Sequence, residues 1–183
     1  MNAQFVWFIL LSLPLIFISR KSLLNPGTHG FYRFLAFEGI LWLLVANLPF
    51  WFSDPFTPRQ IASWILLFIS LYLVTDAVIR LRRHGKARQM RDDPALMSFE
   101  KTTQLVESGI YRYIRHPMYS SLLFLCWGIF LKHPGAGLFG VALVVSGLLT
   151  ETALIDEKEC RAYFGETYRH YMQRTKRFVP FIL

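Results

Sequence analysis

The stretch MYSSLLFLCWGIFLKHPGAGLFGVALVVSGLLTETALI, residues 118–155, consists of two apolar runs joined by KHPG at 132–135. Because proline and glycine end helices, this stretch predicts two antiparallel helices joined by a tight turn. The runs cover residues 118–131 and 137–155. At about 1.5 Å per residue, the first run reaches only about 21 Å. The pair therefore either crosses a membrane incompletely or begins among the lipid headgroups.

Three earlier apolar runs cover residues 3–19, 34–52 and 61–79. Each is within the range of about 17 to 25 residues that crosses a hydrocarbon layer. The 183 residues are 54% hydrophobic and only 17% charged, which is too apolar for a soluble domain of this size. We therefore predict an all-α, polytopic integral membrane protein with about five transmembrane helices. Residues 1–79 would form a scaffold of three helices, and residues 80–183 would hold a loop, the helical hairpin and a C-terminal segment.

Positive charge is divided unevenly between the predicted loops. Of the 20 Lys and Arg residues, all but Arg59 and Lys132 fall on one side of the predicted membrane. The positive-inside rule then predicts that residues 80–117 and 156–183 lie at the cytoplasmic face of the cell inner membrane or an equivalent membrane, with the N-terminus outside. Topology and attraction to anionic lipid account for the net charge of +8 without a nucleic-acid partner.

The two cysteines, Cys126 and Cys160, have no spacing typical of a metal site and are poorly placed to pair with each other. We expect neither a disulfide nor a bound metal. No charged residue precedes Arg20, and no cleavage motif follows the first apolar run. The first run is therefore expected to remain on the protein rather than to be removed as a signal peptide.

Two carboxylates interrupt the first three runs. Glu38 and Asp76 both lie near the predicted cytoplasmic ends of their helices. Carboxylates inside a membrane are costly and are functional candidates by default. Here, however, Arg33 and Arg80 are near in sequence, so pairing with these arginines or contact with water is favoured over a role in the site.

Polar residues gather instead near the ends of the predicted hairpin. Because its helices are antiparallel, the start of the first and the end of the second must lie side by side. His116 and Tyr119 are therefore expected close to Asp156 and Glu157, with Pro117 in the first helical turn.

Further along the chain, Gly165 is expected to end a helix. Tyr168 and Tyr171 then share one face of a short segment. Rings, acids and backbone donors against apolar walls suit a small cationic cofactor shared with an apolar substrate. These residues alone do not select that cofactor.

The order and spacing of these residues resemble the isoprenylcysteine carboxyl methyltransferase family, with phospholipid N-methyltransferases as more distant relatives. The resemblance covers residues 80–183. Its elements are Leu105-Val106 with Gly109 and Tyr111, Arg115-His116-Pro117 with Tyr119, Asp156-Glu157, Phe164-Gly165 with Tyr168 and Tyr171, and Arg177-Phe178 before Pro180.

The resemblance implies an S-adenosyl-L-methionine-dependent methyltransferase in the membrane. Its methyl acceptor would be a lipophilic or small molecule with a carboxylate, amine or thiol. The implied cofactor-binding residues are Thr103, Gln104, Leu105, Val106, Gly109, Tyr111, His116, Pro117, Met118, Tyr119, Asp156 and Glu157. Glu151 and Arg115 are the candidate catalytic residues, for orienting or deprotonating the acceptor and for meeting its charge.

Three positions depart from the family pattern. Thr103 stands where the family commonly has histidine, and Asp156-Glu157 replaces two glutamates. Thr152 stands where prenylcysteine methyltransferases carry an arginine that faces the substrate carboxylate. An amine or thiol acceptor would tolerate Glu151 better than a carboxylate would.

Two other classes of protein are compatible with the same pattern. A membrane reductase of the sterol-reductase type, which uses a nicotinamide cofactor, would share the hairpin. A non-enzymatic membrane adaptor would use the basic face to bind lipid or a protein partner. The adaptor would have no need of an acidic pair facing a His-Pro-x-Tyr step.

Overall fold

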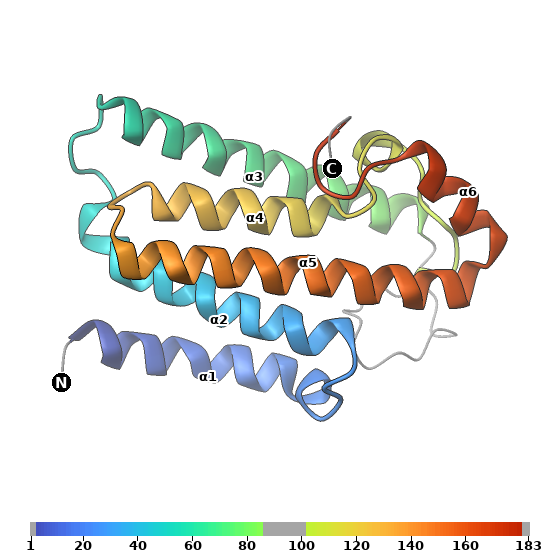
Figure 1. Cartoon of the computed structure of the whole chain (residues 1–183), viewed down its shortest axis with the longest axis horizontal. Helices are drawn as coiled ribbons and strands as arrows, with labels where there is room; N and C mark the ends of the chain where they lie inside the picture. Colours follow the sequence, from blue (N-terminus) through green and yellow to red (C-terminus); the bar gives the residue numbers. More distant parts are fainter. Residues whose placement is uncertain (1–2, 86–101, 181–183) are drawn as a thin grey trace.

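The computed structural model describes residues 3–85 and 102–180 of the chain, and the secondary structure there is helical (Figure 1). Two short 3-10 helices accompany six α-helices in these residues. The elements are α1 (Ala3–Leu23), α2 (His29–Asn47), η1 (Leu48–Phe50), α3 (Pro58–His84), η2 (Gly109–Arg112), α4 (Pro117–Phe130), α5 (Ala136–Phe164) and α6 (Glu166–Arg174).

Four of these helices, α1, α2 with η1, α3 and α5, are long and apolar enough to cross a membrane. The fifth apolar helix, α4, has only 14 residues. The prediction of a polytopic helical membrane protein is confirmed. The proposed boundary between residues 79 and 80 stays a prediction, and Lys86, Arg88, Arg91 and Lys101, which were counted in the topology, lie outside the described residues.

The long helices run nearly parallel or antiparallel, in the order α3, α4, α5, α2, α1 across the bundle (Figure 1). The core lies where α2, α4 and α5 meet, around Leu43, Ile129 and Leu149. Helices α2 and α5 approach closely because residue 39 is glycine. A Cβ atom on Gly39 would lie 2.4 Å from Cγ2 of Val145, so any larger residue would force the two helices apart.

The turn between α4 and α5 is as tight as predicted and is tied to α3. The buried Lys132 Nζ donates to Gln60 Oε1 at 3.1 Å and lies 3.7 Å from the centre of the Trp64 ring. Burial and the nearby Arg59 lower the pKa of Lys132. These contacts fix the end of the bundle opposite the predicted cofactor pocket.

The two intramembrane carboxylates have different partners. Asp76 pairs with Arg80 at 3.2 Å, as predicted. Glu38 Oε2 accepts a hydrogen bond from Ser12 Oγ of α1 at 2.6 Å, a partner that was not predicted, and its pairing with Arg33 or contact with water stays a prediction. Residues five apart in a helix point about 140° away from each other, so Arg33 and Glu38 do not share a face.

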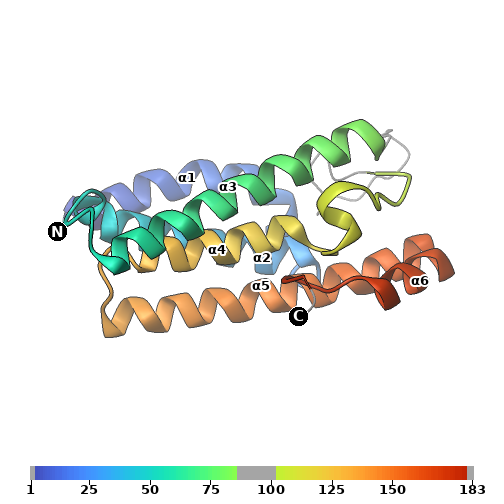
Figure 2. The ribbon, with the colours of Figure 1, turned by 90° about the horizontal axis from the view of Figure 1, so that it is seen from above.

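Helix α4 is short because it begins late, and this creates space at one end of the bundle. Its first turn starts at Pro117, whereas α3 and α5 extend well beyond that level (Figure 2). The space between the ends of α3 and α5 is occupied by residues 102–116 and by α6. The predicted pocket lies at this end.

Candidate active site

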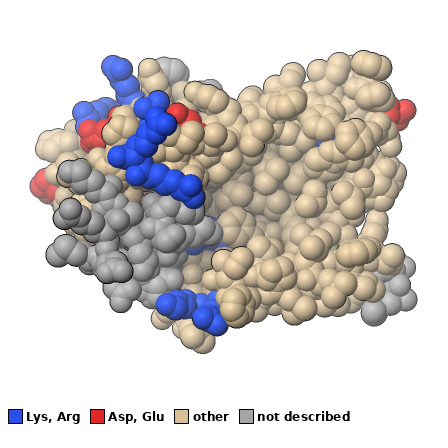
Figure 3. Space-filling view, turned by 180° about the vertical axis from the view of Figure 1, so that it is seen from behind, with Lys and Arg blue, Asp and Glu red and all other residues tan. Residues whose placement is uncertain are grey.

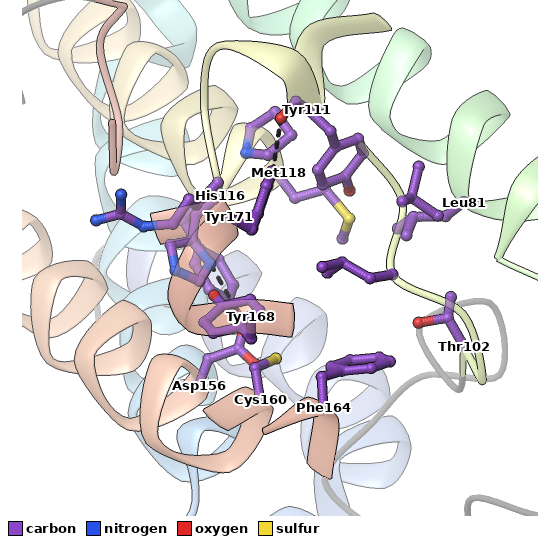
Figure 4. Close-up of a pocket in the computed structure, with 15 residues that line it drawn as sticks. Leu81, Thr102, Tyr111, His116, Met118, Asp156, Cys160, Phe164, Tyr168 and Tyr171 are labelled. Carbon is purple, nitrogen blue, oxygen red and sulfur yellow. Dashed lines mark hydrogen bonds and ion pairs between the residues drawn. The ribbon is translucent and has the colours of Figure 1, made fainter. Parts of the chain in front are cut away.

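A cavity lies between the end of α3, the segment leading into α4, the last turns of α5, and α6 (Figure 4). Its walls are mainly aromatic and apolar, with a few polar groups on one side. It is lined by Leu81, Thr102, Leu105, Val106, Tyr111, Arg115, His116, Pro117, Met118, Tyr119, Asp156, Cys160, Phe164, Tyr168 and Tyr171.

Three polar side chains meet on one wall of the cavity. His116 Nδ1 lies 3.4 Å from Asp156 Oδ2, and Tyr119 Oη donates to the same oxygen at 3.2 Å. The rings of His116 and Tyr119 stack with their centres 5.4 Å apart. The predicted approach of the start of α4 to the end of α5 is therefore confirmed, and it fixes the direction of the Asp156 carboxylate.

Glu157 lies behind this wall and does not line the cavity. Only 3% of its side chain is exposed. Arg115 Nε and Arg177 Nε each donate to Oε1 at 3.0 Å, and Arg177 Nη2 donates to Oε2 at 3.0 Å. His116 Nε2 is 3.4 Å from Oε1. Glu157 thus joins the two arginines to the back of the His116 ring.

The polypeptide after α6 forms part of the same support. The backbone N–H groups of Arg115 and His116 donate to the carbonyls of Lys176 and Arg177 at 2.7 and 3.2 Å. A single parallel bridge joins Ile114 and Lys176. Residues 175–178 therefore run beside residues 113–116 and hold them in place.

Arg115 belongs more to this support than to the open cavity. Besides Glu157, its guanidinium donates to the carbonyl of Met172 at 3.1 Å and to that of Thr175. These bonds occupy most of its donor directions. Its predicted catalytic role stays a prediction, whereas its role in joining α5, α6 and the following segment is observed.

Helix α6 supplies an aromatic wall of the cavity, which Leu81 near the end of α3 also lines. Tyr168 and Tyr171 are both buried, and Tyr171 Oη donates to the carbonyl of Tyr111 at 2.6 Å. Burial raises the pKa of both tyrosines. They therefore stay protonated near neutral pH and present ring faces rather than negative charge to the cavity.

The protonation of His116 is set by two opposing effects. Burial by itself lowers the pKa of a histidine, but the adjacent Asp156 and Glu157 carboxylates outweigh burial and raise the pKa of His116 above its ordinary value of 6.5. The two carboxylates therefore stabilise the imidazolium form, in which each protonated ring nitrogen lies 3.4 Å from one carboxylate oxygen.

Nine of the predicted site residues line the cavity: Leu105, Val106, Tyr111, Arg115, His116, Pro117, Met118, Tyr119 and Asp156. Thr103 and Gln104 lie next to it, and their N–H groups donate to the carbonyl of Gly85 at the end of α3. Gly109, the first residue of η2, does not line this cavity but a second hollow beside it. Glu151 is exposed on α5 outside the cavity, so its predicted role stays a prediction.

Several lining residues were not predicted. Cys160 and Phe164 follow Asp156 at intervals of four residues on one face of α5. That spacing was present in the sequence, but the prediction assigned only Asp156 and Glu157 of this region to the site. Tyr168 and Tyr171 were noticed as a pair but were not assigned to the site.

The carboxylate wall also brings together groups that could ligate a metal. Ligand atoms of His29, Asp156 and Glu159 lie within 4.8 Å of one another. His29 Nδ1 is 2.5 Å from Glu159 Oε2, and Asp156 accepts from Tyr119. The contact between His29 and Glu159 ties the start of α2 to α5. The expectation of no metal stays a prediction.

The fold and the cavity define a class of protein: a polytopic helical membrane protein with an aromatic and acidic site at one end of its bundle. Residues 58–167, more than half of the chain, match a family model described as phospholipid methyltransferase. The chain belongs to this family. The match runs from the start of α3 to the start of α6 and includes most of the cavity wall.

Individual relatives are also methyltransferases by name. Protein-S-isoprenylcysteine O-methyltransferase B of Arabidopsis thaliana is 33% identical over 87 residues, which cover 45% of this chain and 43% of the relative. A probable protein-S-isoprenylcysteine O-methyltransferase of Oryza sativa subsp. indica is 27% identical over 130 residues, covering 68% and 66%. Methanethiol S-methyltransferase 1 of Bradyrhizobium diazoefficiens is 25% identical over 119 residues, covering 65% and 39%.

The chain thus spans less than two thirds of the length of each of these relatives. No solved structure matches it. The resemblance to membrane methyltransferases of the isoprenylcysteine type is confirmed. The methyl donor, the acceptor and the orientation in the membrane are not given by these comparisons.

Proposed function

We propose that the chain is an S-adenosyl-L-methionine-dependent methyltransferase that acts on an acceptor reaching the cavity from the membrane. The observation that carries the proposal is the convergence of His116, Tyr119 and Asp156 on an aromatic cavity in a chain of the phospholipid methyltransferase family. The cofactor would supply a methyl group bound to a positively charged sulfur, which becomes a neutral thioether as the methyl is transferred.

The residues present fit this cofactor by their chemistry. The Asp156 carboxylate, held by Tyr119 and His116, is oriented to accept hydrogen bonds from amino or hydroxyl groups. Tyr168 and Phe164 present ring faces, which attract a sulfonium ion without neutralising it. Apolar walls from Leu81 and Val106 keep water from the reacting atoms.

The role of these residues in the reaction is alignment. Methyl transfer needs the donor carbon and the acceptor atom in line, and fixed binding groups achieve this before the reaction begins. Glu157 supports the alignment indirectly, because it holds His116 through one oxygen and Arg177 through both. We propose that Glu157 is a positioning residue rather than a direct ligand of the cofactor.

The charges of the cavity favour an amine or thiol acceptor over a carboxylate. Among the described lining residues, the cationic groups are Arg115 and His116, and both already face carboxylates. Thr152, which stands where prenylcysteine methyltransferases carry an arginine, is neutral. It is also fully buried, and its hydroxyl donates to the carbonyl of Leu148. A carboxylate acceptor would therefore enter without a partner charge, which costs free energy.

Calorimetric titration of the detergent-purified protein tests the donor. S-Adenosyl-L-methionine is expected to bind, and a reduced nicotinamide dinucleotide is not. Asp156→Asn and His116→Ala are expected to weaken binding by about tenfold or more, since each removes a charge-assisted contact. Lys158→Gln, an exposed change on the same helix, serves as the control. Wild-type affinity in both site variants would refute the proposal.

The acceptor is tested separately with membranes that contain the protein and donor labelled in its methyl group. An alkanethiol, a phospholipid with a primary amine and a prenylcysteine carboxylate form the panel. Label in the thiol or amine, with the carboxylate unlabelled, is the expected result. Preferential labelling of the carboxylate would contradict the charge argument while leaving the donor assignment intact.

A further inference from the structure

A second hollow, the groove, lies on the opposite side of η2 from the cavity. Tyr72 and Arg80 line it from α3, and Arg112 and Tyr113 from the segment 109–113. Tyr111, which precedes Arg112 in the same turn, lines the cavity instead. The single turn of η2 therefore separates the two hollows, and the groove shares no lining residue with the cavity.

The groove has a fixed floor. Asp76 Oδ2 accepts from the N–H of Ile110 at 3.0 Å, and Asp76 Oδ1 accepts from Arg80 Nε at 3.2 Å. Gly109 has φ +63°, and a Cβ atom there would lie 2.4 Å from Arg80 Nε. Only glycine allows η2 to approach α3 this closely. As a result, the position of the Arg80 guanidinium is set by the fold.

The charge of the groove suits one phosphodiester. Arg80 and Arg112 bring two positive charges, and Asp76 brings one negative charge. The remaining single positive charge matches the single negative charge of a phosphodiester. Guanidinium groups are well suited to this ligand because their planar donors bind two phosphate oxygens at once.

An apolar stripe on α3 leads into the groove. Ile61, Ile65, Phe68 and Tyr72 are all exposed large side chains, and they follow one another at three- or four-residue intervals. They therefore share the face of α3 that continues to Arg80. Because α3 is long and apolar enough to span the membrane, this exposed face meets lipid chains, and Arg80 lies four residues before the end of the helix.

The charged end of the molecule agrees with this placement. On the face shown in Figure 3, Lys and Arg gather at one end, and the rest of that face is almost free of charge. This is the end where α3 finishes and α6 lies (Figures 1 and 3). From the groove, the stripe and this charge distribution, we infer that the groove binds the phosphodiester headgroup of a membrane phospholipid whose acyl chain lies along the stripe from Ile61 to Tyr72.

Native mass spectrometry of the full chain in detergent tests the inference with phosphatidylglycerol as the probe. The double variant R80Q/R112Q is expected to weaken the first lipid-binding event by about tenfold, the effect of losing one or two charge-assisted contacts. The matched control is R82Q/R83Q, which removes the same charge from exposed positions at the same end of α3. The control is expected to bind as the wild type does.

Two further arms identify the ligand and guard against misfolding. The water-soluble headgroup glycerophosphoglycerol is expected to bind far more weakly than the lipid, because it cannot use the stripe. Equal binding would mean a soluble phosphate site and would overturn the lipid assignment. R112Q alone leaves the Asp76–Arg80 pair intact and is expected to show part of the loss.

Equal weakening in R82Q/R83Q and R80Q/R112Q would show diffuse attraction to basic charge rather than a groove, and would overturn the inference. Wild-type lipid binding in R112Q and in the double variant would do the same. S-Adenosyl-L-methionine titrations of the variants separate this inference from the proposed function, because neither Arg80 nor Arg112 lines the cavity.

Discussion

Arg177 and Glu157 form a two-point ion pair. Arg177 Nε donates to Oε1 of Glu157, and Arg177 Nη2 donates to Oε2, both at 3.0 Å. Glu157 lies on α5 and Arg177 in the segment after α6. The pair therefore joins α5 to the segment after α6, and it helps to hold residues 175–178 beside residues 113–116. Hydrogen bonding to Glu157 also raises the pKa of Arg177, which remains charged.

The first prediction concerns this ion pair. Glu157→Ala leaves two guanidinium groups and the His116 ring without their shared carboxylate. Removal of one partner from a buried charged network costs about 3 kcal/mol. We expect a lower thermal unfolding midpoint in detergent, weaker cofactor binding, and a smaller loss for Glu157→Gln. Lys158→Gln, a change at the neighbouring exposed position, is the control. Equal unfolding midpoints of Lys158→Gln and Glu157→Ala would contradict the role of Glu157 in supporting the site.

A second prediction concerns pH. The folded-state pKa of His116 is raised above its ordinary 6.5. The stabilisation is therefore fully present below about pH 6.5 and is lost as pH rises through the folded-state pKa. The unfolding midpoint of the wild type is expected to fall by a few degrees over this range, measured between about pH 6 and about pH 9. His116→Gln should flatten that part of the curve, and an unchanged slope in the variant would assign the effect to another group.

A third prediction concerns the glycine between the groove and the cavity. Gly109→Ala places a Cβ atom at positive φ and 2.4 Å from Arg80 Nε. The left-handed conformation alone costs about 1 to 2 kcal/mol for a residue with a side chain. We expect a lower unfolding midpoint and, because η2 carries Tyr111, weaker cofactor binding. Gly140→Ala is the matched control, since nothing lies within 4 Å of its Cβ position, and in a helix this change is expected to stabilise slightly.

A fourth prediction uses the two cysteines. Cys160 is partly exposed in the cavity wall, whereas Cys126 is fully buried in the core. N-Ethylmaleimide is expected to modify Cys160 alone, read by intact-protein mass spectrometry, with Cys160→Ser as the unlabelled control. Saturating S-adenosyl-L-methionine should slow the reaction because it covers the cavity. A labelling rate that the cofactor does not change would place the cofactor elsewhere.

Local sequence signals were sufficient to predict the hairpin. The turn residues at 132–135 and the two apolar runs require antiparallel helices, and this alone brings His116 near Asp156. The apolar run ends at residue 155, but the helix continues to Phe164 and ends at Gly165, where the sequence predicted a helix end. Cys160 and Phe164 were not assigned to the site because the prediction did not follow the face of this helix beyond Asp156 and Glu157.

Contacts between segments that are far apart in the chain could not be predicted from local sequence patterns. Residues 175–178 pair with residues 113–116 through backbone groups, whose bonding does not depend on side-chain identity. Arg177 was noted only as part of the family resemblance, and its partner could not be predicted from spacing. The hydrogen bond from Ser12 to Glu38 was not predicted for a related reason, because Ser12 belongs to another helix.

The docking of residues 175–178 also has a consequence for biosynthesis. Synthesis proceeds from the N-terminus, so α1 to α5 are available to the bilayer before Arg177 has left the ribosome. Until then Glu157 faces Arg115 and His116 without its second guanidinium. The cavity wall is thus completed only when residues 175–178 are present, and a chain truncated before them is expected to keep its apolar helices but to lose this support for residues 113–116.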